Sequence, residues 1–213
     1  MSNPDDITTT HLRRCLNETR MPVDPTDVVM PMGSDDWPYQ LRQQLGGTLK
    51  PAGVLIPVIE RNSAGLSLLL TQRAAELRHH AGQVSFPGGR WEPGDTDIVA
   101  TALRETREEI GIAQDEVSVI GYLSPMPTIT GFVVTPVVGV VSGDIELCLD
   151  HTEVEYSFEV PLPFLMDAGN QRMVERDLGG RMTTMAEYHY DGQRIWGATA
   201  FIIREFIKIL KKE

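Results

Sequence analysis

Three glutamates in one short stretch are the residues best placed to do chemistry. Glu105, Glu108 and Glu109 belong to the run Arg-Glu-Thr-Arg-Glu-Glu. On an α-helix, residues three and four apart lie on one face, so these carboxylates are expected to converge on a single patch. Like charges so close repel one another unless a cation lies among them, and a hard divalent ion with oxygen ligands is the simplest candidate. The alternative is a solvated acidic helix face without a ligand.

Two glycines and two arginines precede these glutamates. Gly88 and Gly89 permit a turn and a close approach of the backbone to a phosphate group. Arg73 and Arg78 lie further upstream, and a guanidinium group is suited to bidentate phosphate contacts. Surface solvation explains each arginine equally well. Together the four residues make phosphate binding the first hypothesis for this region.

Other polar residues near the glutamates have plainer interpretations. Arg104 is expected to pair with Glu108 one helical turn on, and to orient one of the other carboxylates. His79 and His80 are candidates for acid, base or ligand, but a hydrogen-bonded structural histidine is the commoner outcome.

The helix that carries the glutamates has clear boundaries in the sequence. Asp95, Thr96 and Asp97 are N-cap candidates, and Gly111 is a natural terminator after Ile110. Apolar residues at helical spacing predict a buried opposite face. The other helices are expected over residues 9–17, 36–45, 161–166 and 198–210. The strands are expected over 53–61, 66–73, 84–86, 117–123, 132–141, 156–160, 182–190 and 193–196, which indicates a mixed sheet with helices on both faces.

Length and charge limit the classes of protein. The chain has 213 residues, enough for one domain with a good core, and residues 47–213 are expected to form it. Residues 1–46 form an N-terminal arm that is disordered, folds back on the core or joins a subunit interface such as that of a homodimer. A formal charge of −11 argues against binding to a nucleic-acid backbone or an anionic membrane surface.

Cysteine usage and hydropathy predict a cytoplasmic location. Only Cys15 and Cys148 are present, which is too few for a disulfide framework. The N-terminus lacks the basic start and apolar run of a signal peptide, and the longest apolar stretch, 132–141, is about half a membrane span.

The glutamate region resembles the signature box of the Nudix hydrolases, which cleave nucleoside diphosphates linked to another moiety with Mg²⁺ or Mn²⁺. The matching residues are Gly89, Arg104, Glu105, Glu108, Glu109, Gly111 and Ile112. The resemblance implies an α/β fold, an α/β/α sandwich with a mixed sheet and a loop-helix-loop catalytic box. The usual glutamate after the glycine is Asp95 here, at a spacing one residue longer, and Thr106 fills a slot that is normally aliphatic. These departures put Asp95 in doubt as a direct metal ligand.

The resemblance can be assigned to one branch of the Nudix hydrolases. Residues 69–73 and 77–89 are similar to the signature that precedes the box in the coenzyme A pyrophosphatase branch. It implies hydrolysis of coenzyme A or an acyl derivative to 3′,5′-ADP and 4′-phosphopantetheine or its acyl form. Glu105, Glu108 and Glu109 would be the metal ligands, and Glu153 resembles a later-loop acidic residue of this branch. The alternative interpretation of Glu153 is an exposed acidic residue that lies just before a strand and has no catalytic role. Other nucleoside diphosphate derivatives, or a non-catalytic ligand-binding role on the same scaffold, remain the competing hypotheses.

Overall fold

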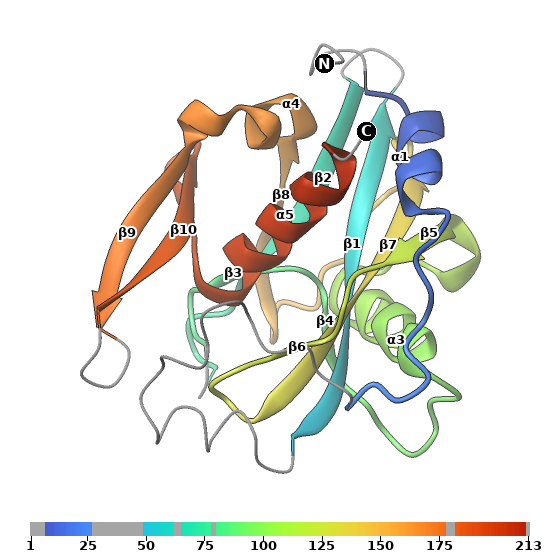
Figure 1. The fold of residues 1–213 in the computed structure, drawn as a ribbon. Helices are drawn as coiled ribbons and strands as arrows, with labels where there is room; N and C mark the ends of the chain where they lie inside the picture. The colour runs from blue at the N-terminus through green and yellow to red at the C-terminus, as the bar shows by residue number, and fades with distance from the viewer. Residues whose placement is uncertain (1–6, 27–48, 62–64, 78–79, 178–181, 212–213) are drawn as a thin grey trace.

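The computed structural model describes residues 7–26, 49–61, 65–77, 80–177 and 182–211. An eight-stranded mixed sheet forms its centre, with strand order β3-β2-β1-β7-β5 (Figure 1). Three further strands join this path at its sides, β4 on β1, β6 on β7 and β8 on β2. The strands are β1 (Lys50–Arg61), β2 (Gly65–Arg73), β3 (Val84–Ser85), β4 (Gly88–Arg90), β5 (Val117–Tyr122), β6 (Met126–Pro127), β7 (Phe132–Ser142) and β8 (Val154–Pro161).

The two central strands are the only parallel pair of the described sheet, β1 with β7. Both are apolar along almost their whole length, as expected for strands covered on both faces. Neighbouring residues of β1 serve opposite layers: Leu55 packs in a cluster with Ala102 and Leu103, whereas Ile56 packs with Phe206.

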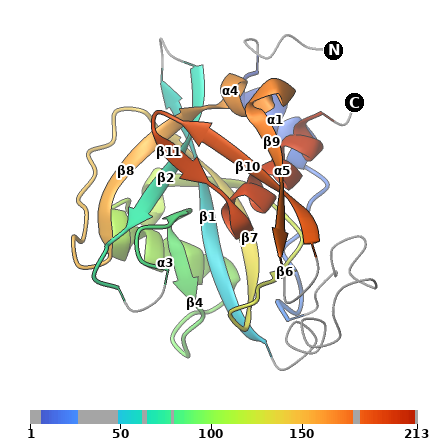
Figure 2. The same ribbon diagram turned by 90° about the vertical axis from the view of Figure 1, so that its left-hand side faces the viewer.

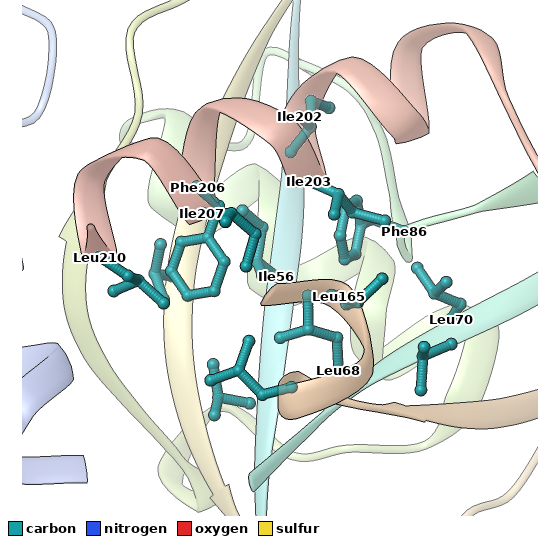
Figure 3. Packing of buried hydrophobic residues seen from close by; sticks show 14 of the residues in the cluster. Ile56, Leu68, Leu70, Phe86, Leu165, Ile202, Ile203, Phe206, Ile207 and Leu210 are labelled. Carbon is teal, nitrogen blue, oxygen red and sulfur yellow. The ribbon is translucent and has the colours of Figure 1, made fainter. Parts of the chain in front are cut away.

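Helices cover both faces of the sheet, as the sequence predicts. Helix α3 (Ile98–Ile110) lies on one face, and α4 (Leu162–Met166) and α5 (Gly197–Leu210) lie on the other. Figure 3 shows the second layer, in which Phe206, Ile203 and Leu165 pack over Ile56 of β1 and Leu68 of β2. The described residues also contain two 3₁₀ turns, η3 (Gln114–Glu116) and η4 (Ala168–Asn170).

The first part of the N-terminal arm folds back on the core. Helix α1 (Thr9–Leu16) is capped by Thr8 and buries Leu12 and Leu16 completely or almost so. These two residues join the same apolar cluster as α5. The helix expected over 36–45, with Trp37, lies outside the described residues, and the domain boundary at 46/47 stays a prediction.

A second, three-stranded sheet extends from the core in the order β11-β10-β9. The hairpin of β10 (Met182–Tyr190) and β11 (Gln193–Ile195) is present as predicted, and its turn has positive φ at both Asp191 and Gly192. The sequence prediction missed β9 (Gln171–Asp177), because this edge strand is mostly charged and exposed. Among the described residues, no helix is long and apolar enough to cross a membrane.

Candidate active site

Helix α3 determines where the box glutamates point. Its N-cap Asp97 accepts the backbone N–H of Ala100 at 2.8 Å, and Gly111 ends it with φ of 81°. Ala102 and Leu103 on one side of the helix pack against the central sheet. The glutamates therefore lie on the remaining sides, next to β4.

The three glutamates differ in burial and in what they face. The side chain of Glu109 is 3% exposed, that of Glu105 16% and that of Glu108 51%. Glu109 and Glu105 face the turn at Gly88 and Gly89, whereas Glu108 points further out. In the described part of the chain, no three Asp, Glu, His or Cys side chains are grouped closely enough to enclose a metal ion. The role of the glutamates as metal ligands therefore stays a prediction.

Both glycines of the turn leave room for neighbouring groups, the backbone at Gly88 and the Glu105 side chain at Gly89. Gly88 has φ of 146°, and a Cβ atom there would lie 2.4 Å from the carbonyl oxygen of Gly53. A Cβ on Gly89 would lie 2.4 Å from the carboxylate of Glu105. The backbone N–H of Gly88 donates to Glu109 Oε2 at 3.0 Å. The turn thus holds two of the three glutamates in place, and its role toward phosphate stays a prediction.

Arg104 connects the acidic residues to one another. Its Nη1 donates to Glu105 and to Glu108, both at 3.0 Å, so the expected ion pair with Glu108 is present. Its Nε and Nη2 donate to the two carboxylate oxygens of Asp95 at 2.9 and 3.0 Å. A further bond runs from Nη2 to the carbonyl of Arg90 at 3.1 Å. Arg104 therefore orients Glu105 from a fixed position.

Both carboxylate oxygens of Asp95 accept hydrogen bonds from Arg104, so neither oxygen is left without a donor. Besides Arg104, Asp95 accepts the N–H of Glu92 at 3.0 Å and the hydroxyl of Thr101 at 2.9 Å. The bonds from Arg104 contribute most to lowering the pKa of Asp95 to about 2. Asp95, a shorter carboxylate set one residue further from Arg104 than is usual in the box, therefore serves to position Arg104. Its altered spacing put Asp95 in doubt as a direct metal ligand but did not indicate this partner.

Thr106 shows how the helix accommodates a polar residue in an aliphatic slot. The side chain is fully buried, and its hydroxyl donates to the carbonyl of Ala102 at 2.6 Å. The hydroxyl is therefore satisfied within the helix and leaves the glutamates undisturbed.

Burial raises the pKa values of the two inner glutamates, Glu105 and Glu109. Burial is the largest influence that raises the pKa of Glu109 to about 7, against the Gly88 N–H and Arg73, which lower it. Burial likewise raises the pKa of Glu105, although the bond from Arg104 lowers it. The negative charge of Glu153 raises the pKa of both. The inner site thus holds more carboxylate charge than its own basic groups neutralise.

The position of Glu153 follows from how its loop is tied down. The N–H of Cys148 donates to the backbone carbonyl of Ile110, and the N–H of Asp150 donates to the backbone carbonyl of Glu109, both at 3.0 Å. These bonds attach the loop to the end of α3. The carbonyl of Glu153 accepts the N–H of Ala74 at 2.8 Å, next to the end of β2. An exposed acid far along the chain is therefore close to the box glutamates.

Arg73, the last residue of β2, lies beside Glu109. Its Nη1 is 3.4 Å from Glu109 Oε1, and its Nε is buried without a hydrogen-bond partner. Arg78 and His79 lie outside the described residues. His80 has φ of 58°, and its Nδ1 forms a hydrogen bond with Oε1 of Gln83 at 2.8 Å. This is the structural role that the sequence predicts as the commoner outcome for this histidine.

Carboxylate oxygens are the donors that a divalent ion such as Mg²⁺ or Mn²⁺ prefers. Glu105 and Glu109 present them at the Gly88–Gly89 turn and Glu108 presents them further out, so the donor chemistry fits such an ion although the described side chains do not enclose one as they stand. Mg²⁺ usually retains several waters, which suits a partly open set of carboxylates.

Comparison with known proteins places this site in a family. Residues 49–176 match the model of the NUDIX domain. The chain belongs to the Nudix family. The Nudix box identified in the sequence lies inside the matched range, and Nudix hydrolases generally use divalent metal ions and act on nucleoside diphosphate derivatives.

Bacterial proteins named "Uncharacterized Nudix hydrolase NudL" are similar over most of this Nudix chain. The protein of Citrobacter koseri is 44% identical over 168 residues, which cover 78% of this chain and 86% of the relative. That of Escherichia coli O7:K1 is 42% identical over 156 residues, 73% of this chain and 80% of the relative. Among solved structures, a Caenorhabditis elegans Ap4A hydrolase binary complex has a TM-score of 0.43 and 22% identity, covering 55% of this chain and 82% of that one.

Proposed function

We propose that this Nudix hydrolase cleaves the pyrophosphate of coenzyme A or an acyl-coenzyme A, giving 3′,5′-ADP and 4′-phosphopantetheine or its acyl derivative. One observation carries the proposal. The segment that resembles the coenzyme A branch begins at Leu69, and its described residues, 69–77 and 80–89, include most of β2, all of β3 and the start of β4. It ends at the turn beside Glu105 and Glu109. The part of the chain that indicates the substrate is therefore the wall of the acidic site.

The chain's own residues have separate tasks in this reaction. Water adds to a pyrophosphate phosphorus, the bond from that phosphorus to the bridging oxygen breaks, and a carboxylate takes the proton of the water. Arg104 keeps Glu105 in one orientation, and the Gly88 N–H and Arg73 do the same for Glu109. Arg73 and Arg78 are the proposed phosphate-binding side chains, and the backbone at Gly88 and Gly89 is the proposed close contact.

Glu105, Glu108 and Glu109 are the proposed holders of Mg²⁺ or Mn²⁺, and Glu153 is the proposed carboxylate that assists them. A bound ion would neutralise charge on the phosphoryl oxygens and favour deprotonation of water. The candidate general bases are Glu153 and the box glutamates. The exposure of Glu153 keeps it accessible to water, whereas Glu109 is enclosed.

The decisive assay incubates the purified protein with coenzyme A and Mg²⁺ or Mn²⁺ and separates the products by chromatography. We expect 3′,5′-ADP and 4′-phosphopantetheine in equal amounts, and no products with a chelator present. If neither product forms while ADP-ribose, a dinucleotide or a nucleoside triphosphate is turned over rapidly, the branch assignment is wrong and the alternative Nudix substrate class is correct. No turnover of any of these would favour a non-catalytic binding protein.

The remaining predictions from the sequence concern the surroundings of the enzyme. The partner is a small-molecule nucleotide, with no nucleic-acid or membrane partner expected. A homodimer and a cytoplasmic location stay predictions.

A further inference from the structure

The outer face of the β9–β11 sheet is basic, although the chain carries a formal charge of −11. Tyr188 and Ile195 are buried on the inner face, so the alternating residues Glu187, His189 and Arg194 lie on the outer face. The pairing of β10 with β9 places further residues of β9 on the same outer face. The described outer face consists of Arg172, Val174, Arg176, Thr183, Met185, Glu187, His189 and Arg194, with three arginines against one carboxylate.

A single buried carboxylate orders the centre of this face. Glu187 is 6% exposed, and its Oε2 accepts Nη2 of Arg176 at 3.0 Å and Nη2 of Arg194 at 2.6 Å. Its Oε1 contacts His189 Nε2 at 2.5 Å. Because both guanidinium groups share one oxygen, they lie close together, and one carboxylate cannot neutralise both. Their side chains are about two-fifths exposed, at 42% and 41%, so donors remain for an anion.

An aromatic ring adjoins the paired arginines. The guanidinium carbon of Arg194 lies 5.2 Å from the ring centroid of Trp196, whose residue is 39% exposed. A large exposed indole beside ordered guanidinium groups combines a stacking surface with donors for a phosphate dianion. A nucleoside with a phosphate monoester on its ribose has both complementary parts.

Strands β11 and β3 connect the basic face to the chain segment that leads to the Gly88 turn. Strand β11 packs against β3, and the hydroxyl of Thr199 at the start of α5 donates to the carbonyl of Val84 at 2.9 Å. From Val84, the chain reaches the Gly88 turn within a few residues. In Figure 2 the β10–β11 hairpin overlaps β2 and lies higher in the view than β4 and α3. A substrate long enough to pass from the turn along β3 to β11 would bring its nucleoside to this sheet.

We infer that Arg176, Arg194 and Trp196 bind the nucleoside half of the substrate, with the two guanidinium groups on its 3′-phosphate and the indole against its base. Glu187 is a positioning residue that orders the arginines. The inference rests on the proposed function, because coenzyme A carries a 3′-phosphate that most other Nudix substrates lack. A purely structural ion-pair cluster would not distinguish nucleotides that differ only at this phosphate.

Calorimetry on the full chain tests the inference without turnover. The titrants are 3′,5′-ADP and 5′-AMP, which differ by one phosphate monoester. Wild-type protein should bind 3′,5′-ADP about tenfold or more tightly, the effect of one or two charge-assisted hydrogen bonds. Arg194→Gln and Arg176→Gln should each remove most of that preference, and Trp196→Leu should weaken both nucleotides by a similar factor. The matched control Arg13→Gln removes one positive charge on α1, where Arg13 bonds Ser118, and should keep the preference.

The result that overturns the inference is equal binding of 3′,5′-ADP and 5′-AMP by the wild-type protein, which requires no variant to fold. Retention of the preference by both arginine variants, with melting curves like the wild type, would overturn it as well. As a second readout, the ratio of kcat/KM for coenzyme A to that for 3′-dephospho-coenzyme A should fall toward one in Arg194→Gln. If coenzyme A is not hydrolysed but the preference for 3′,5′-ADP persists and depends on the arginines, the proposed function fails while the nucleotide site stands.

Discussion

Arg104 donates from Nε and Nη2 to the two carboxylate oxygens of Asp95, at 2.9 and 3.0 Å, and from Nη1 to Glu105 and Glu108. The side chain of Asp95 is only 5% exposed, and that of Arg104 is 23% exposed. The pair therefore joins the loop before α3 to the middle of the helix, and it sets the direction of Glu105.

Asp95→Asn should lower both activity and stability. The variant leaves Arg104 with one charged partner fewer and frees it to rotate. We expect kcat/KM to fall about tenfold and the free energy of unfolding by about 1–2 kcal/mol. Urea denaturation and steady-state kinetics measure the two effects. Arg90→Gln, which removes a 71% exposed side chain but not the Arg90 carbonyl that Arg104 uses, is the control; an equal loss in that variant would contradict the prediction.

The same pair predicts an acid-sensitive contribution to stability. The folded protein holds the pKa of Asp95 at about 2, below its ordinary value of 3.8. A lowered carboxylate pKa stabilises the fold above the unfolded value, and the stabilisation disappears as the pH falls through the folded value. The difference in unfolding free energy between wild type and Asp95→Asn should thus be constant above about pH 5 and shrink between pH 4 and 2. A difference that stays constant down to pH 2 would contradict the assignment.

Glu109→Gln should abolish turnover and leave the fold intact. The buried carboxylate becomes a neutral amide of the same shape that still accepts the Gly88 N–H. We expect a loss of kcat by a factor of about 100 or more, as for other groups that act directly on the reacting atoms. Activity within a few fold of the wild type would show that Glu109 is outside the catalytic site.

Stability without divalent ions should fall as the pH rises toward neutrality. Burial raises the pKa of Glu109 from 4.5 to about 7, so the folded state retains a proton that the unfolded chain releases. The wild type should lose about 2–3 kcal/mol between pH 4.5 and 7 from this group, and Glu109→Gln should not. Parallel pH profiles for the two proteins in a chelating buffer would refute the prediction.

Gly89→Ala should damage the site more than the fold. The added methyl group would meet the carboxylate of Glu105, which is the movable end of a side chain, so Glu105 shifts while the backbone stays. A displacement of about 1 Å in a catalytic group can cost about 100-fold in rate. Gly94→Ala is the matched control, because a Cβ there meets no atom within 4 Å. Equal activity of the two variants would contradict the proposed role of Glu105.

The boundaries of α3 and of the central strands follow from local patterns, and the structure agrees with them. Asp97 and Gly111 are a helix cap and a terminator, and β1 and β7 are apolar runs of strand length. Local patterns could not indicate that Glu109 is buried, because its burial arises from β4 and from the loop that holds Glu153. The altered spacing put Asp95 in doubt as a metal ligand, but local patterns could not indicate its bonds to Arg104, since these depend on the shape of the loop. β9 was missed because charged residues occupy most of its positions, so the strand lacks a clear alternation of apolar and polar residues.

The parallel pairing of β1 with β7 also has a consequence for folding. Lys50 lies opposite Phe132 and Glu60 opposite Ser142, and β2 pairs with β8, so the centre of the sheet joins segments that are far apart in the chain. Contacts of this kind slow folding, because a long loop must close before any of them forms. On the ribosome, β1 and β2 emerge well before β7 and β8 and must wait for them with apolar residues uncovered. The newly made protein is therefore exposed to aggregation during synthesis, and its set of carboxylates is complete only after the chain as far as Glu153 has emerged.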